Sequence, residues 1–110
     1  MDIIDTYYEI LGDFDADRLR AIVAPDLAFE GPIAGRRTGA EPFIAGAAGF
    51  AKAARRITLL QREPTAALYD AELPGGTVRF AEFFEVVDGR IQALRLHYDA
   101  AAFTAAMRAR

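Results

Sequence analysis

Residues 76–99 carry the clearest alternation of apolar and polar residues in the chain, and this pattern constrains the fold most. From Val78 onward every second residue of the first half is apolar except Glu82, as in a β-strand with one buried face. Asp88-Gly89 favours a chain reversal, because glycine adopts a positive φ at little cost. Residues 90–98 then return as the partner strand. The sequence therefore predicts a β-hairpin with one carboxylate in the middle of its apolar face.

The length of the turn decides where the side chain of Glu82 points. A two-residue turn would pair Glu82 with Arg95, and a cross-strand ion pair at the surface would then neutralise the carboxylate. A three-residue turn with a bulge at Gly89 would pair Glu82 with Leu94, against an apolar wall. The second register gathers the apolar residues of both strands on one face and leaves His97 on the other, so we favour it. The first register stays open as the alternative.

Composition excludes several classes of protein. The chain has 110 residues, of which 53% are hydrophobic and 26% charged, so we expect one domain, 1–110. The formal net charge is -3 and no basic stripe is present, so we expect no nucleic-acid partner. No cysteine is present, which excludes disulfides and a cysteine nucleophile. With a single histidine, any metal site would have to be rich in carboxylates, and we expect none. The first ten residues contain no apolar run of signal-peptide or membrane-span length. We therefore expect a cytoplasmic protein without a membrane partner.

Four helices are expected, each after residues that favour helix initiation. Pro25 would end the second of them. The predicted helices are 3–14 after Asp2, 16–24 after Asp15, 39–53 with Thr38 and Glu41 at capping-box spacing, and 100–109 after Asp99.

Three further strands are expected at 27–30, 56–63 and 65–73, and the glycine-rich residues 31–39 are expected to form a loop. Helices gathered in one half of a chain and antiparallel strands in the other predict an α+β domain with the helices on one face of the sheet. A curved sheet covered in this way leaves an apolar interior that suits a small molecule.

Three segments resemble the SnoaL-like branch of the nuclear transport factor 2-like (NTF2-like) superfamily. They are YYEILGDFDADRLRAIVAPDLAFEGP, RRTGAEPFIAGAAGF and FFEVVDGRIQALRLHYDAAAF, and together they span nearly the full chain. The resemblance implies a cone-shaped, curved antiparallel sheet with three N-terminal helices on its concave face, a fold also called cystatin-like. The superfamily includes steroid isomerases, polyketide cyclases, epoxide hydrolases, dehydratases and domains without known activity, so the fold alone does not name a reaction.

The resemblance also suggests catalytic residues. Tyr7 matches the hydrogen-bonding tyrosine on the first helix of the steroid isomerases, and Glu82 matches their protonated acid. Their base position in the first strand is occupied here by Gly31, and the arginine of the epoxide hydrolases is replaced by Phe80. Glu82 and Tyr7 are thus the candidate catalytic residues, for proton transfer beside a carbonyl without a metal or organic cofactor. The candidate residues for binding a small apolar or cyclic molecule are Phe29, Gly31, Phe50, Phe80, Leu94, Leu96 and Tyr98.

Each of these residues also has a purely structural explanation. Tyr7 and the aromatic residues are common types in a protein core, and Arg36-Arg37 is a typical solvated pair. The rival to an isomerase, cyclase or dehydratase is therefore a ligand-binding or accessory domain without catalysis. On the helix-free face of the sheet we expect an apolar patch that forms a homodimer. This patch would consist of Ala81, Phe83, Ile91 and Ala93.

Overall fold

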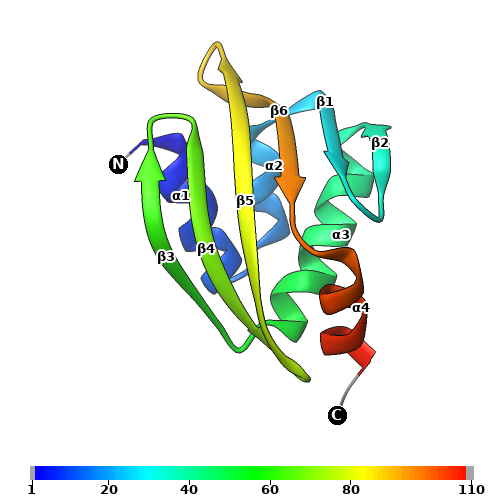
Figure 1. Cartoon of the computed structure of the whole chain (residues 1–110). Helices are drawn as coiled ribbons and strands as arrows, with labels where there is room; N and C mark the ends of the chain where they lie inside the picture. The colour runs from blue at the N-terminus through cyan, green and yellow to red at the C-terminus, as the bar shows by residue number, and fades with distance from the viewer. Residues whose placement is uncertain (1, 109–110) are drawn as a thin grey trace.

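The computed structural model describes residues 2–108 and contains four helices and six strands in that range (Figure 1). The helices are α1 (Ile3–Gly12), α2 (Ala16–Ile22), α3 (Ala40–Ala53) and α4 (Ala100–Arg108). The strands are β1 (Val23–Gly31), β2 (Gly35–Thr38), β3 (Arg56–Glu63), β4 (Ala66–Leu73), β5 (Gly76–Val87) and β6 (Arg90–His97).

Three of the predicted helix caps are confirmed. The carboxylates of Asp2, Asp15 and Asp99 accept hydrogen bonds from backbone N–H groups in the first turns of α1, α2 and α4. The predicted end of α2 was two residues late, because Val23 and Ala24 already belong to β1. A residue before proline disfavours the helical conformation, and Ala24 precedes Pro25.

The segment before α3 differs from the prediction. Residues 35–38 form the short edge strand β2 instead of a loop, and Thr38 pairs with Ala28 of β1 instead of capping a helix. Gly39 is the N-cap of α3, with a φ of 109° and no side-chain hydrogen bond to the first turn. Every residue of β2 is exposed, so this strand has no apolar alternation and forms through its pairing with β1.

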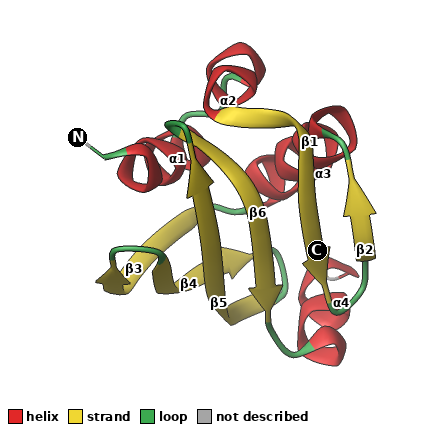
Figure 2. Ribbon diagram, turned by 90° about the horizontal axis from the view of Figure 1, so that it is seen from above, coloured by secondary structure: helices red, strands yellow, loops and turns green. Residues whose placement is uncertain are grey.

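The α+β class is confirmed, with one correction to the sheet. The strand order is β2-β1-β6-β5-β4-β3, and β1 pairs with β6 in parallel, so the sheet is mixed rather than antiparallel. A parallel pair needs a long connection, which α3 and strands β3 to β5 supply. The sheet is curved, and α1, α2 and α3 lie on one of its faces (Figure 2). None of the described helices is long and apolar enough to cross a membrane.

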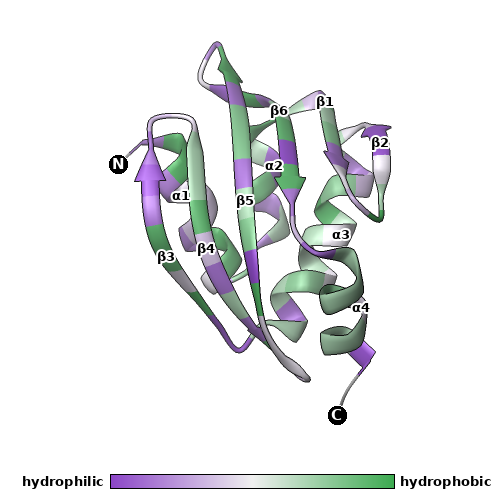
Figure 3. Ribbon diagram, viewed as in Figure 1, coloured by the Kyte–Doolittle hydropathy of each residue, from purple (hydrophilic) through white to green (hydrophobic). Residues whose placement is uncertain are grey.

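The β5–β6 hairpin follows neither of the two registers considered from the sequence. Val87 pairs with Arg90, so the turn has two residues, and Asp88 and Gly89 have positive φ values of 50° and 74°. A one-residue irregularity between the Val86 and Glu85 pairs then shifts the register, and Glu82 pairs with Leu96. This shift turns the side chain of Glu82 toward the apolar face of the sheet, as in the favoured register. Hydrophobic and hydrophilic residues alternate along β5 and β6 accordingly (Figure 3).

The position of this irregularity, beyond Ile91 instead of at Gly89, changes which residues lie on the helix-free face of the sheet. Ile91 is 0% exposed and belongs to the core, so its predicted place in the outer apolar patch was wrong. Phe83 keeps its predicted position and is 42% exposed on the helix-free face. Arg95 lies 5.9 Å from the centre of the Phe83 ring, and His97 lies beside the same ring with centroids 5.6 Å apart. The ion pair between Arg95 and Glu82 is therefore not formed.

Candidate functional site

Glu82 is the only charged residue among the buried side chains of residues 2–108, with 1% of its surface exposed. Two consecutive tyrosines of α1 donate hydrogen bonds to its carboxylate. The Tyr7 hydroxyl lies 3.1 Å from Oε2, and the Tyr8 hydroxyl lies 2.7 Å from Oε1. Both oxygens of one buried carboxylate are thus bound by separate phenol groups.

The two tyrosines reach Glu82 from different sides, because consecutive helical residues point about 100° apart. The Tyr7 ring packs edge-on against Phe84 at 5.5 Å, while the Tyr8 ring packs edge-on against Tyr69 of β4 at 5.4 Å. The rotation of α1 about its own axis therefore decides whether both hydroxyls meet the carboxylate.

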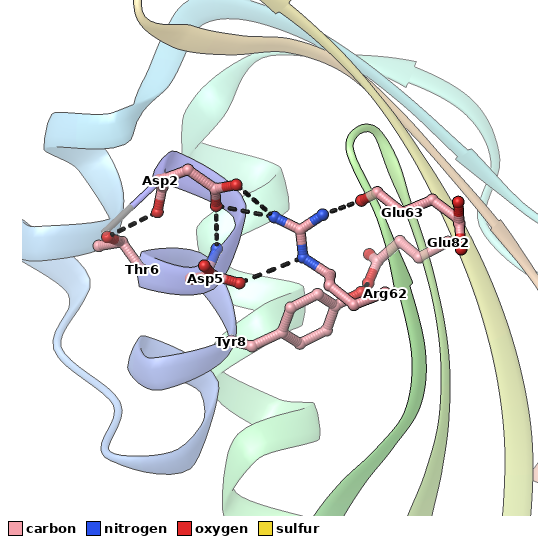
Figure 4. Close-up of polar contacts among 7 residues, drawn as sticks. All are labelled: Asp2, Asp5, Thr6, Tyr8, Arg62, Glu63 and Glu82. Atoms are coloured by element: carbon pink, nitrogen blue, oxygen red, sulfur yellow. Dashed lines mark hydrogen bonds and ion pairs between the residues drawn. The ribbon is translucent and has the colours of Figure 1, made fainter.

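Arg62 of β3 holds the beginning of α1 in place (Figure 4). One of its terminal nitrogens lies 2.7 and 2.8 Å from the carboxylate oxygens of Asp2, and its Nε lies 3.2 Å from Asp5. The other terminal nitrogen donates to the backbone carbonyl of Glu63. Among the ion pairs of the described residues, those of Arg62 are the ones that join a helix to the sheet. Tyr8 follows one turn after Asp5.

Burial dominates the electrostatics of the site. Removal from water raises the pKa of Glu82 to about 7, although the hydrogen bonds from Tyr8 and Tyr7 oppose the rise. Burial, together with the nearby Glu82 carboxylate, raises the pKa values of both tyrosines, so these stay protonated as donors. A carboxyl group with a pKa near neutrality can both take and release a proton at pH 7.

A cleft of about 270 Å³ reaches Glu82 from the side of Tyr7. Its wall includes every residue that the sequence suggested for the site, and their roles in binding or catalysis stay predictions. Tyr8 is not among the lining residues, so Glu82 lies between the cleft and the α1–β3 side of the fold. The lining residues are Tyr7, Leu11, Phe29, Glu30, Gly31, Ile33, Ala34, Pro42, Phe43, Gly46, Ala47, Phe50, Tyr69, Phe80, Glu82, Leu94, Leu96, Tyr98 and Phe103.

A larger hollow of about 650 Å³ does not reach Glu82. It is lined by exposed residues such as Phe83, Arg36 and Glu85, so it is a groove in the helix-free face rather than an enclosed chamber. The smaller cleft is the better candidate site, because it combines apolar walls with a buried ionisable group.

Gly31 leaves the wall of the cleft without a side chain at the position where the isomerase pattern has its base. A Cβ atom there would lie 3.8 Å from Leu96 and 3.9 Å from Tyr98, which are ordinary contacts. The neighbouring Glu30 carries its carboxylate 3.8 Å from Arg36, in a strand-to-strand ion pair. The described residues also contain no cluster of three or more His, Cys, Asp or Glu that could hold a metal ion.

Two residues of the site were missed from the sequence. They are Tyr8 of α1 and Tyr69 of β4, which were missed because neither differs in the sequence from an ordinary core aromatic residue. The signal for Tyr69 was the two-residue alternation of β4, which places it with the buried Ala67 and Ala71 on the face that carries Glu82.

Comparisons with known proteins agree with this geometry. Residues 4–94 match the family model for a SnoaL-like domain. A solved protein from Kribbella flavida, described as of known function, is 31% identical with a TM-score of 0.82, over 94% of this chain and 89% of that chain. No curated protein matches the sequence significantly.

Two more distant solved structures are similar in fold. A Silicibacter pomeroyi protein with a cystatin-like fold is 17% identical, with a TM-score of 0.82 over 96% of this chain and 79% of its own. A steroid delta-isomerase from Pseudomonas aeruginosa is 13% identical, with a TM-score of 0.78 over 96% and 82%. At these identities the likeness concerns the fold alone. Because the family model covers most of the sequence, the chain belongs to the SnoaL-like domain family of the NTF2-like superfamily.

Proposed function

We propose that this protein binds a small, uncharged ring compound in the cleft and moves a proton beside its carbonyl group, with Glu82 as the base. The observation that carries the proposal is the buried carboxyl group at the cleft wall, held by Tyr7 and Tyr8 and with a pKa of about 7. A general base is most effective when its pKa lies near the working pH.

The size of the cleft limits the ligand. An apolar cavity of about 150 Å³ holds one benzene ring, and the cleft measures about 270 Å³. A molecule of one or two rings therefore fits. Polyketide-derived rings and other cyclic ketones belong to this size class.

The charge of the cleft limits the ligand further. Its lining contains the buried carboxyl group of Glu82 and no Lys, Arg or His, and the carboxylate of Glu30, another wall residue, pairs with Arg36. An anionic ligand would lose its hydration without gaining a cationic partner, which costs several kcal/mol. Carboxylates and phosphates are therefore poor candidates, whereas a neutral ketone carries no such penalty.

The proposed reaction is an enolisation, the common first step of isomerisation and of many cyclisations. The Glu82 carboxylate takes a proton from the carbon beside the carbonyl. The electron pair of that C–H bond becomes the new C=C bond, and the carbonyl π pair moves onto oxygen. Return of the proton to the same or a conjugated carbon regenerates the carboxylate. Tyr7 and Tyr8 keep the carboxylate oriented through their hydrogen bonds.

Deuterium exchange into 2-tetralone, a two-ring ketone, tests this proposal. In D₂O the wild-type protein should accelerate exchange at the carbons beside the carbonyl, with a rate that rises with pH and levels off above about pH 7. Glu82→Gln keeps the shape of the side chain but cannot accept the proton, so it should abolish the acceleration. Equal exchange rates in the two proteins would refute Glu82 as the base. 2-Naphthoate, of similar size but anionic, should not compete with 2-tetralone.

A second candidate is a binding domain without catalysis. Gly31 favours it, because the strand position that carries the base in the isomerase pattern has no side chain here. Under this alternative 2-tetralone binds, but its deuterium exchange is no faster than in buffer.

We also propose that the helix-free face forms a homodimer. Phe83 is 42% exposed at the centre of the sheet, and no described helix covers this face (Figure 1). A Phe83→Glu variant should be monomeric by light scattering where the wild type is dimeric. A monomeric wild type would contradict the proposal.

A further inference from the structure

The hydroxyl group of Tyr69 differs from those of Tyr7 and Tyr8, which both donate to Glu82. No hydrogen bond joins it to any residue in the range 2–108, and burial and the Glu82 carboxylate raise its pKa well above the ordinary value. Among the described residues, every fully buried side-chain oxygen or nitrogen has a hydrogen-bond partner. Only 1% of the surface of Tyr69 is exposed, but its hydroxyl oxygen has no such partner, so this atom itself keeps some accessible surface. The hydroxyl is therefore open to the cleft that Tyr69 lines. A protonated donor at such a position can serve a bound molecule.

The sheet register places Tyr69 next to Glu82. Ala67 pairs with Glu82, and Tyr69 pairs with Phe80, so Tyr69 and Glu82 are diagonal neighbours on one face of the sheet. The Tyr69 ring is stacked on Phe80 at 5.1 Å and is contacted edge-on by Tyr8, which fixes its direction.

The other polar groups near the carboxylate are already engaged. Tyr7 and Tyr8 each donate their single hydroxyl proton to Glu82. Beyond Tyr8, the Arg62 guanidinium is bound by Asp2, the N-cap of α1, and by Asp5 in its first turn. Tyr69 is therefore the fully buried donor of the cleft that is free to meet a ligand.

We propose that the Tyr69 hydroxyl donates a hydrogen bond to the carbonyl oxygen of the ligand while Glu82 faces the neighbouring C–H bond. This inference rests on the proposed function, which it deepens by assigning the group that stabilises the enolate oxygen. Negative charge collects on that oxygen as the proton leaves, and a preoriented donor lowers the barrier. It also assigns the ligand chemistry, namely a ring ketone whose oxygen points toward β4.

The test uses Tyr69→Phe with two ligands, 2-tetralone and its hydrocarbon analogue tetralin. The variant should bind 2-tetralone about 3 to 10 times more weakly, because one hydrogen bond is lost. Tetralin has no oxygen, so its affinity should not change. Where the wild type accelerates deuterium exchange, Tyr69→Phe should lower the maximal rate about 100-fold. The pH at which the exchange rate is half-maximal should be the same as in the wild type, because it reports the ionisation of Glu82.

Thermal unfolding of the free protein provides the structural control. Because its hydroxyl has no partner, Tyr69→Phe should unfold at the wild-type temperature or above it. Tyr7→Phe and Tyr8→Phe are matched controls that each remove an existing hydrogen bond, and they should unfold at a lower temperature.

Three results would overturn the inference. They are an unchanged affinity of Tyr69→Phe for 2-tetralone, an equal loss of affinity for tetralin, and an unfolding temperature that falls as far as in Tyr8→Phe. If the wild type binds 2-tetralone without accelerating exchange, the base role of Glu82 fails, and the affinity ratio still decides the role of Tyr69. If the wild type binds neither compound, both proposals fail together.

Discussion

Replacement of Glu82 by glutamine should change how the stability of the protein depends on pH. In the folded protein the pKa of Glu82 is raised from 4.5 to about 7, mainly by burial. The folded state therefore holds this proton up to about pH 7, and the unfolded state loses it near pH 4.5. The stability contributed by the protonated group is fully present below pH 4.5 and is lost as the pH rises through 7. Glutamine has no such proton to lose.

The size of the effect follows from the two pKa values. One pH unit between them corresponds to about 1.36 kcal/mol, so the rise from 4.5 to about 7 corresponds to roughly 3 kcal/mol. The free energy of unfolding of Glu82→Gln, minus that of the wild type, should increase by about this amount between pH 4 and pH 8. Urea titrations of both proteins at half-unit steps of pH give the difference curve.

Glu41→Gln is the matched control, because its carboxylate is exposed and its pKa is lowered by the hydrogen bond from Arg20. The stability from this pair is present above the unfolded pKa and is lost as the pH falls, so its difference curve should run in the opposite direction. A flat curve for Glu82→Gln between pH 4.5 and 8 would refute the reasoning. It would mean that the tyrosine hydrogen bonds cancel the effect of burial.

Three further predictions concern the surroundings of Glu82. Tyr8→Phe should raise the pKa of Glu82 more than Tyr7→Phe does, because the hydrogen bond from Tyr8 is 2.7 Å long and that from Tyr7 is 3.1 Å long. Carboxyl NMR titration measures the pKa of Glu82 in both variants, and equal values would contradict this ranking. Arg62→Met should lower the unfolding temperature and loosen α1, which admits water to Glu82 and so lowers its pKa toward the ordinary value. Arg79→Met, which breaks the exposed pair with Asp70, should leave that pKa unchanged. Gly31→Leu should abolish binding of 2-tetralone, because the new side chain would occupy the cleft. The far-UV circular dichroism spectrum should stay that of the wild type, since a Cβ atom at this position meets only ordinary contacts. Normal binding by the variant would place the ligand elsewhere.

The facing of Glu82 was predictable from the sequence, but the pairing was not. Apolar residues on both strands require that Glu82 share a face with Phe80 and Leu94, and any single irregularity between the turn and Glu82 satisfies this requirement. The favoured bulge at Gly89 and the observed irregularity beyond Ile91 therefore turn Glu82 toward the same face, although its partner is Leu96 instead of Leu94. They differ for Ile91 itself, which the observed position turns into the core.

Other features depend on tertiary contacts that leave no local pattern. Strand β2 is a run of four exposed residues whose partner, β1, supplies all its order. The caps at Asp2, Asp15 and Asp99 were predictable because each is a contact between residues two or three positions apart. The Tyr8–Glu82 bond joins residues 74 positions apart, and it depends on how α1 is rotated over the sheet.

Under the proposed function, the arrangement around Glu82 lets one carboxyl group serve where the isomerase pattern has two. Burial alone would raise the pKa of Glu82 further, and two tyrosine donors bring it back to about 7. A base with a pKa near 7 can take up and release a proton at neutral pH, so it needs no second carboxylate to accept the proton. The price is that Tyr7, the donor expected from the resemblance, is bound to the base and is not available for the ligand oxygen. That role falls to a donor with no partner, and Tyr69 on the neighbouring strand meets this condition. The two proposed functions of the site, base and donor, are thus linked: a ligand that binds through Tyr69 presents its acidic carbon to Glu82.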